Sequence, residues 1–172
     1  GLGQGAWGRA MLGRVLESDR PLVVDADALN LLAADPIHRD DWVLTPHPGE
    51  AARLLRVAGG TAQADRFAAA AAIREGFGGV CVLKGAGTVV AGAGLPAVCT
   101  GGNPGMASGG MGDVLTGTVA GLAAQGLSAE RAARLGVCLH AAAADRAAAA
   151  EGERGLLATD LLPHLRRLVN PA

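Results

Sequence analysis

The sequence predicts an α/β fold with a mostly parallel central sheet flanked by helices. Half of the 172 residues are apolar and 18% are charged, which is typical of a folded domain and argues against a disordered chain. Short continuous apolar runs alternate with segments whose apolar residues recur at helical spacing. Parallel strands are buried on both faces and have this continuous apolar pattern. We therefore expect a single domain over residues 1–172.

The strands are expected where apolar runs are short and continuous. Three buried runs are Pro21–Asp27, Trp42–Thr45 and Gly79–Lys84. Two shorter β segments, Thr88–Ala91 and Ala97–Thr100, flank a glycine-containing turn and predict a hairpin. Ligands of parallel sheets gather beyond the carboxyl ends of the strands, so the polar residues that follow these runs are the first candidates for a site.

The helices are expected in the alanine-rich and amphipathic segments. In order, they cover residues 6–17, 51–57, 65–75, 113–124 and 128–150, and a last helix starts at Thr159. Ser128 is expected to cap the N-terminus of the fifth of these helices. Trp7 and Trp42 are interpreted as packing residues. Asp145, inside the long helix, is interpreted as a surface or core residue rather than a ligand.

The charge and the cysteine content exclude several functions. A net charge of −1 and an aromatic content of 2% argue against a nucleic-acid partner, and no apolar run is long enough to span a membrane. The three cysteines are dispersed and lack zinc-ligand spacing, which fits a reducing compartment. Cys81 lies inside an apolar run and is expected to be a core residue.

The chain begins with Gly1 rather than Met, and its first five residues have the composition of a loop. We expect the natural protein to begin upstream.

A glycine-rich segment, Asn103–Gly112, runs directly into a predicted helix at Asp113. Small residues let backbone N–H groups approach an anion, and a helix N-terminus adds unpaired donors and partial positive charge. A carboxylate beside such a site suits a general base, or a group that orients a metal ion or a hydroxyl. The alternative is that Asp113 only caps the helix.

The first buried run ends in Asp25 and Asp27, with Asn30 close behind. One carboxylate at this strand end can orient a metal ion or a substrate hydroxyl. The alternative is structural: Asp27 caps a helix and Asn30 makes a turn hydrogen bond.

The segment Thr45–Glu50 holds His47 between two prolines that restrict the backbone. His47 can hydrogen-bond a ligand, and Glu50 can reach Mg²⁺ through water. The alternative is a rigid turn with Glu50 in the first turn of a helix, where the helix dipole favours it.

Lys84 is the only lysine of the chain, and it lies at a strand end before the flexible loop 85–88. A lysine there suits phosphate binding as a point charge. The alternative, a solvated lysine ahead of a hairpin, is weaker because arginine supplies every other basic side chain.

These motifs together resemble one family. They occur in family order as Val24–Asn30, Leu44–Glu50, Lys84–Thr88 and Gly102–Asp113, and together they span nearly the whole chain. The chain is similar to the ADP-dependent NAD(P)H-hydrate dehydratases, a branch of the ribokinase-like superfamily. The resemblance implies a ribokinase-like layered fold and a Mg²⁺-dependent hydro-lyase. Because the family domain has a substantial segment before the loop at which this chain begins, the resemblance also implies that the fold lacks its N-terminal portion. We therefore expect an incomplete sheet with an exposed edge. Such an enzyme restores NADH or NADPH from the S epimer of the hydrated form while ADP, or ATP in its place, is the co-substrate.

The resemblance also implies a role for each matching residue. Asp113 contacts the hydrate hydroxyl and acts as its base, and Gly109, Gly110, Met111 and Gly112 form the anion hole. The nucleotide site comprises Lys84, Gly85, Ala86, Gly87, Thr88 and Gly112. The hydrated cofactor contacts His47 and Gly3. Glu50 matches the position of a carboxylate that organises Mg²⁺ in related kinases, and Asp27, Asn30 and Asn103 support the phosphate region.

The implied partners are hydrated NADH or NADPH and ADP. The resemblance further implies a homo-oligomer, usually a tetramer, in the cytoplasm, and an epimerase domain upstream in the full-length protein. Two other functions stay open. A ribokinase-like kinase of a small hydroxylated metabolite would release a phosphorylated product, and an inactive nucleotide-binding fragment would bind ADP without turnover.

Overall fold

A five-stranded sheet runs through the first part of the chain in this computed structural model, which describes residues 1–58 and 60–170. The strands lie in sequence order: β1 (Leu22–Val24), β2 (Trp42–Leu44), β3 (Val80–Leu83), β4 (Thr88–Ala91) and β5 (Ala97–Cys99). The first three are parallel, and β4 is antiparallel to β3. All five were predicted, which confirms the α/β class.

The register of the parallel strands brings their carboxyl ends to one edge of the sheet. Val24 pairs with Leu44, and Leu44 pairs with Cys81. The ladder continues one step further, since the Thr45 amide donates to Val24 O (3.0 Å) and the Lys84 amide donates to the carbonyl of Pro46 (2.8 Å). The residues that follow the three strands therefore start from neighbouring positions.

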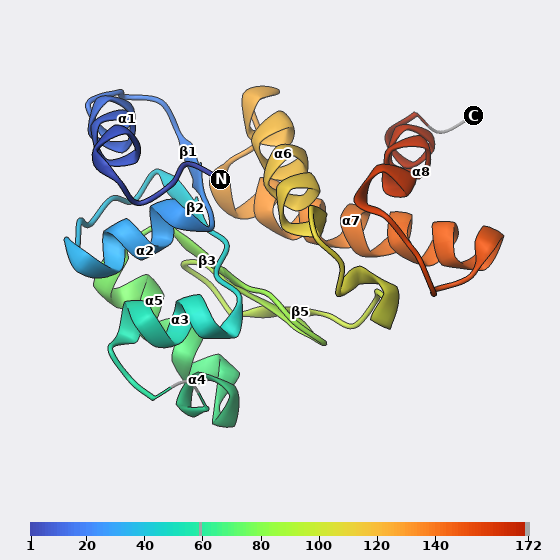
Figure 1. Cartoon of the computed structure of the whole chain (residues 1–172), viewed down its shortest axis with the longest axis horizontal. Coiled ribbons are helices and arrows are strands. Elements are labelled where there is room, and N and C mark those ends of the chain that lie inside the picture. The colour runs from blue at the N-terminus through green and yellow to red at the C-terminus, as the bar shows by residue number, and fades with distance from the viewer. Residues whose placement is uncertain (59, 171–172) are drawn as a thin grey trace. The chain divides into compact units, whose positions relative to one another are not determined.

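The described residues fall into two compact units, and the first, Gly1–Val98, contains most of the sheet and five helices among the residues described (Figure 1). They are α1 (Ala6–Leu16), α2 (Asp27–Ala34), α3 (Pro48–Leu55), α4 (Thr61–Ala64) and α5 (Arg66–Phe77). The short helix α4 was not predicted. Helix α5 packs on β3, β4 and α3, and Asp65 caps it by accepting the Ala68 amide.

The core of this unit lies between one face of the sheet and helices α2, α3 and α5. Leu44, Cys81 and Leu83 face this core, and the Cys81 prediction is confirmed because the residue is fully buried. Val43 and Val82, at the alternate positions, are also buried. Burial of both faces explains why these strands are continuous apolar runs.

The two tryptophans differ. Trp42 is fully buried, and its Nε1 donates to the carbonyl of Phe77 (3.0 Å), as expected for a packing residue. The same expectation for Trp7 is wrong, since this residue is 65% exposed. The buried position of α1 is its neighbour Gly8, where a Cβ would lie 2.1 Å from the carbonyl oxygen of Gly3. The N-terminal loop therefore packs on a different side of the helix from the Trp7 face.

The second unit, Cys99–Ala172, contains three α-helices among its described residues: α6 (Met111–Ala124), α7 (Ala129–Glu151) and α8 (Leu161–Val169). Helix α7 contacts both of the others (Figure 1), and Ser128 caps it as predicted by accepting the Arg131 amide. Gly136 permits close approach of α6, because a Cβ there would lie 2.6 Å from Cγ2 of Val119. None of the helices in the described ranges is both long and apolar enough to cross a membrane.

Candidate active site

The carboxyl ends of β1, β2 and β3 bring together a cluster of charged side chains. Lys84 follows β3, and its Nζ lies 2.6 Å from Oδ1 of Asp25, which follows β1. Glu50, in the first turn of α3 beyond β2, places Oε2 3.9 Å from the same nitrogen. These side chains are 20%, 12% and 7% exposed, respectively. Lys84 is therefore a paired lysine in a largely buried cluster, and the solvated-lysine alternative is wrong.

His47 is the N-cap of α3, so this helix begins three residues before the predicted start. Its Nδ1 accepts the Gly49 amide (3.0 Å), and its own amide donates to Oε2 of Glu50 (2.8 Å). Because Nδ1 is an acceptor, the neutral ring carries its proton on Nε2, which lies 3.4 Å from Oε1 of Glu50. The rigid-turn alternative is thus realised. The imidazole is nevertheless 49% exposed, so the cap still presents it to a ligand.

Asp27 anchors the N-terminal loop rather than capping α2. The N-cap of α2 is Ala26, and Asp27 is the first helical residue, so the predicted capping role is wrong. Its Oδ2 accepts the Gly3 amide (2.8 Å), and its Oδ1 accepts the Gln4 side chain (3.1 Å). The hydrogen bond from Gly3, followed by that from Gln4, lowers the pKa of Asp27. Two residues that the sequence analysis placed in the site, Gly3 and Asp27, therefore contact each other.

Asn30 lies within α2, and its Oδ1 accepts a hydrogen bond from Arg53 on α3 (2.9 Å). This contact joins two helices that start near the charged cluster. The predicted turn hydrogen bond is replaced by a bond between helices.

The predicted nucleotide loop after Lys84 is held by an arginine from α5. Nη2 of Arg66 donates to the carbonyl oxygens of Leu83 (3.0 Å) and Gly87 (3.1 Å). Thr88 Oγ1 donates to the carbonyl of Gly85 (3.0 Å), which closes the loop on itself. Gly85 and Gly87 both have positive φ, as a tight glycine loop requires. The sequence analysis did not single out Arg66.

In the second unit, Asp145 on α7 holds the start of the glycine-rich segment. Its Oδ2 accepts the Gly102 amide (2.9 Å), and its Oδ1 accepts the Asn103 side chain (3.0 Å). Asn103 in turn accepts the Gly105 amide through its own Oδ1 (3.1 Å). Asn103 therefore caps the short 3-10 turn Pro104–Met106, while Asp145 fixes its orientation.

Gly110 turns the glycine-rich segment into helix α6. It is the N-cap, with a φ of +85°, and a Cβ there would lie 3.1 Å from the Cβ of Ala158. The first helical hydrogen bond joins the Val114 amide to the Gly110 carbonyl (3.1 Å). The amides of residues 111–113 precede it and are oriented to serve as anion donors. Asp113 lies in this first turn and is exposed, so its predicted capping alternative is wrong.

Two residues outside the predicted set thus position parts of it. Asp145 was interpreted as a surface or core residue, yet it accepts two hydrogen bonds from the glycine-rich segment. Arg66 spans the nucleotide loop. One feature of the sequence could have indicated this role for Asp145. It is a carboxylate within a mostly alanine stretch of the helix, where a charged side chain adds little stability unless it has a partner.

Comparisons with known proteins identify the family of this chain. A family model for the NAD(P)H-hydrate dehydratases matches residues 1–167. The chain belongs to the NAD(P)H-hydrate dehydratase family. A bifunctional NAD(P)H-hydrate repair enzyme of Coxiella burnetii is 57% identical over 99% of this chain, which covers 35% of that protein. An ADP-dependent (S)-NAD(P)H-hydrate dehydratase of Neisseria meningitidis is 43% identical over 99% of the chain and is covered over 61%.

Solved structures extend the comparison with the dehydratase family. The ADP/ATP-dependent NAD(P)H-hydrate dehydratase of Bacillus subtilis, crystallised with ATP and Mg²⁺, has a TM-score of 0.83 and 32% identity. The match covers 96% of this chain and 60% of the other. Ribokinase-like proteins are among the structural neighbours, which confirms the predicted fold. The chain spans about a third of the bifunctional relatives and less than two thirds of the shorter dehydratases it matches.

Proposed function

We propose that this chain catalyses the ADP-dependent dehydration of the S epimer of hydrated NADH or NADPH, giving NADH or NADPH, AMP and phosphate. The observation that carries the proposal is the turn into α6. There, the amides that precede the first helical hydrogen bond and the Asp113 carboxylate lie within one helical turn, in a segment that matches the dehydratase family. Relatives with this activity in their names support the choice of substrate and nucleotide.

Asp113 is the proposed base. Its carboxylate would accept the proton of the hydrate hydroxyl as that oxygen attacks the terminal phosphorus of ADP, and AMP would leave. The amides of residues 111–113 would stabilise the negative charge of the transferred phosphoryl group. Loss of phosphate from the ester then restores the ring double bond. This order of reaction steps is chemically reasonable because phosphate is a good leaving group, whereas hydroxide is a poor one.

The nucleotide is assigned to Lys84 and the loop 85–88. The loop is preorganised by Arg66, so its backbone does not have to be ordered on binding. Lys84 would supply positive charge to the phosphates. His47, half exposed at the cap of α3, and Gly3 are assigned to the hydrated cofactor.

Mg²⁺ is assigned to Glu50 through water. Among the described residues, no group of three or more His, Cys, Asp and Glu side chains could hold a metal ion. Magnesium, however, keeps several waters and is shared with substrate phosphates, so one carboxylate is a sufficient protein contact. When bound, the ion would neutralise phosphate charge. Both oxygens of Glu50 already lie near His47, so Glu50 fits a contact to the ion through water better than direct coordination.

The test is recovery of reduced nicotinamide absorbance from hydrated NADH with Mg²⁺, with and without ADP, and with Asp113→Asn as the control variant. Recovery that requires ADP and is lost in the variant supports the proposal. A phosphorylated product without recovery would instead identify a kinase, and ADP binding without turnover would identify an inactive module.

The remaining inferences from the resemblance are also proposals. The protein would be a homotetramer in the cytoplasm, and a bifunctional full-length form would carry an epimerase domain. Bifunctional names among the relatives support the second domain. Sedimentation velocity of the purified protein tests the tetramer.

A further inference from the structure

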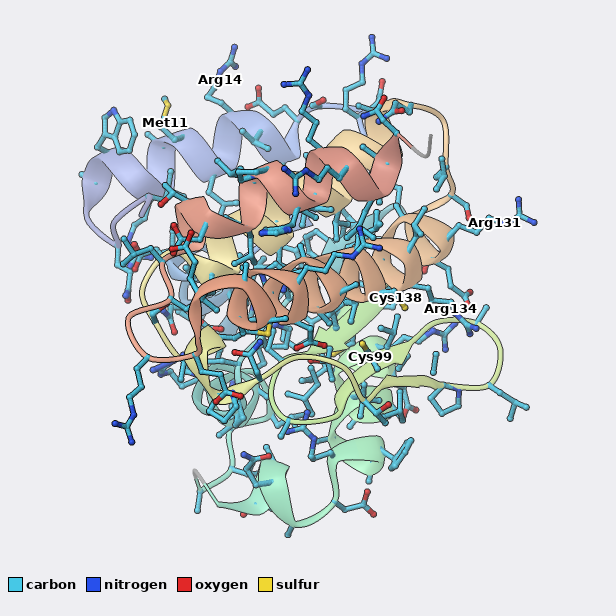
Figure 2. The ribbon with its side chains drawn as sticks, turned by 90° about the vertical axis from the view of Figure 1, so that its right-hand side faces the viewer. Met11, Arg14, Cys99, Arg131, Arg134 and Cys138 are labelled. Atoms are coloured by element: carbon cyan, nitrogen blue, oxygen red, sulfur yellow. The ribbon has the colours of Figure 1, made fainter. Side chains whose placement is uncertain are left out.

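Two of the three cysteines, far apart in the sequence, meet in the second unit. Cys99 ends β5 and Cys138 lies on α7. A Cβ on Gly101 would lie 4.0 Å from Sγ of Cys99 and 3.4 Å from Cβ of Ala141, one turn beyond Cys138, so Cys99 lies beside this part of α7. Figure 2 shows both sulfur atoms on the same side of α7. Both cysteines are free thiols. The two thiols are therefore neighbours that are not joined by a disulfide.

The contact belongs to a longer seam along one face of α7. Cys138, Ala141 and Asp145 are spaced at i, i+3 and i+7, so they lie on one face of the helix. A Cβ on Gly101 would lie 3.4 Å from Cβ of Ala141, and Asp145 accepts the Gly102 amide. The segment 99–103 thus runs along this face, and the thiol pair is at its first contact.

The pair is accessible, in contrast to the third cysteine. Cys138 is exposed and Cys99 is partly exposed, whereas Cys81 is buried in the core. Burial raises the pKa of Cys81 to about 12, which makes it an inert internal reference. Partial burial, then the neighbouring Cys99, raises the pKa of Cys138, which argues against a catalytic nucleophile.

We propose that Cys99 and Cys138 form a dithiol modification site that a peroxide converts reversibly to a disulfide. In the first step one thiolate attacks the peroxide, so that a sulfur–oxygen bond forms, the O–O bond breaks, and hydroxide leaves. In the second step the other thiol attacks this sulfenic acid, the sulfur–sulfur bond forms, and water leaves. Two electrons pass from the two sulfur atoms to the peroxide.

The disulfide would join β5 to α7 at the start of the glycine-rich segment. At the other end of the seam, Asp145 already holds Gly102 and Asn103 by hydrogen bonds. Oxidation would therefore attach residues 99–103 to α7 at both ends. The proposal concerns the site itself and does not depend on the proposed enzymatic function.

The experiment treats the reduced 172-residue chain with hydrogen peroxide, blocks the remaining thiols with N-ethylmaleimide in denaturant, and measures intact mass and peptides. We expect a loss of about 2 Da, one maleimide (on Cys81) instead of three, and a linked Cys99–Cys138 peptide that dithiothreitol removes. Cys99→Ser and Cys138→Ser are the matched variants, and each should abolish the intramolecular link. In Cys99→Ser, Cys138 should gain oxygen instead.

Three maleimides after peroxide treatment would overturn the proposal. Oxygen addition to Cys138 without a link in the unmodified chain, or disulfides only between chains, would overturn it equally. Circular dichroism of both serine variants tests whether they fold, so that an absent link can be assigned to the missing thiol.

Discussion

The two groups of candidate site residues are held in place by different kinds of contact. In the first unit, Asp25, Glu50 and Lys84 position one another through charged side chains that are mostly buried. In the second, the backbone conformation positions the residues. Gly110 turns the chain at positive φ, and Asp113 is exposed in the helical turn that follows. Charge removal should therefore disturb the fold in the first group, whereas removal of the Asp113 charge should mainly disturb the chemistry.

The largest effect is expected for Asp113→Asn, which tests the second half of this comparison. Loss of a general base should lower kcat by about 10²–10⁴-fold. The free energy of unfolding should fall by no more than about 1 kcal/mol, because only a first-turn charge is removed. Turnover, ADP titration calorimetry and urea denaturation measure the three quantities. Parallel losses of turnover, affinity and stability would show that Asp113 is structural.

Lys84→Ala tests the first half. Removing the ammonium next to the largely buried Asp25 carboxylate should cost about 2–4 kcal/mol of unfolding free energy, and ADP should bind about 10–100-fold more weakly. Urea denaturation and ADP titration measure both. The double variant Lys84→Ala/Asp25→Ala is the control: it should regain part of the stability and none of the affinity. A change in kcat with ADP affinity intact would contradict the binding role.

Asp145→Ala examines how far the backbone turn depends on one side chain. The variant loses the hydrogen bonds to Gly102 and Asn103, which should cost about 1–2 kcal/mol and lower kcat about tenfold. Glu151→Ala, a change at an exposed position of the same helix, should leave both unchanged. Urea denaturation and steady-state kinetics measure the unfolding free energy and kcat of both variants. Equal values for Asp145→Ala and Glu151→Ala would contradict the positioning role of Asp145.

The smallest effect concerns Asp27. Its folded-state pKa lies below the ordinary value of 3.8, so its contribution to stability is present above pH 3.8 and is lost as the pH falls through the lower folded value. We expect the Gly3 amide resonance to titrate with a midpoint below 3.8. A series of ¹⁵N spectra measures this midpoint, and Asp27→Asn should abolish the transition. A midpoint at or above 3.8 would mean that the Gly3 contact is absent in solution.

The same contrast explains what the sequence could predict. β2 and β3 are recognisable because both of their faces are buried, and β1 is a short apolar run that is buried at Val24. The strand-end rule then places Asp25, Glu50 and Lys84 together. The glycine-rich segment was recognised from its residue types. Its 3-10 turn was not predicted, because capping by Asn103 depends on the distant Asp145.

Contacts between residues far apart in the sequence have no periodic signal. Arg66 reaches the carbonyl of Gly87 from α5, and Cys99 lies near Cys138, although nothing in either pattern marks the partner. The prediction that Trp7 is a packing residue was wrong although its pattern is periodic. Its helical spacing with Met11 and Val15 is real, but all three are exposed, so a regular apolar face does not tell which core, if any, it faces.

The single lysine has a practical consequence. Apart from the amine at residue 1, Lys84 carries the only primary amine of the chain, and it lies in the charged cluster with its side chain 20% exposed. Among the side chains, an acylating reagent of amines therefore marks this cluster alone, in a peptide separate from the one that begins at residue 1. The rate of acylation, read from a single peptide, would report directly on whether a nucleotide occupies the loop beside it, with no engineered probe required.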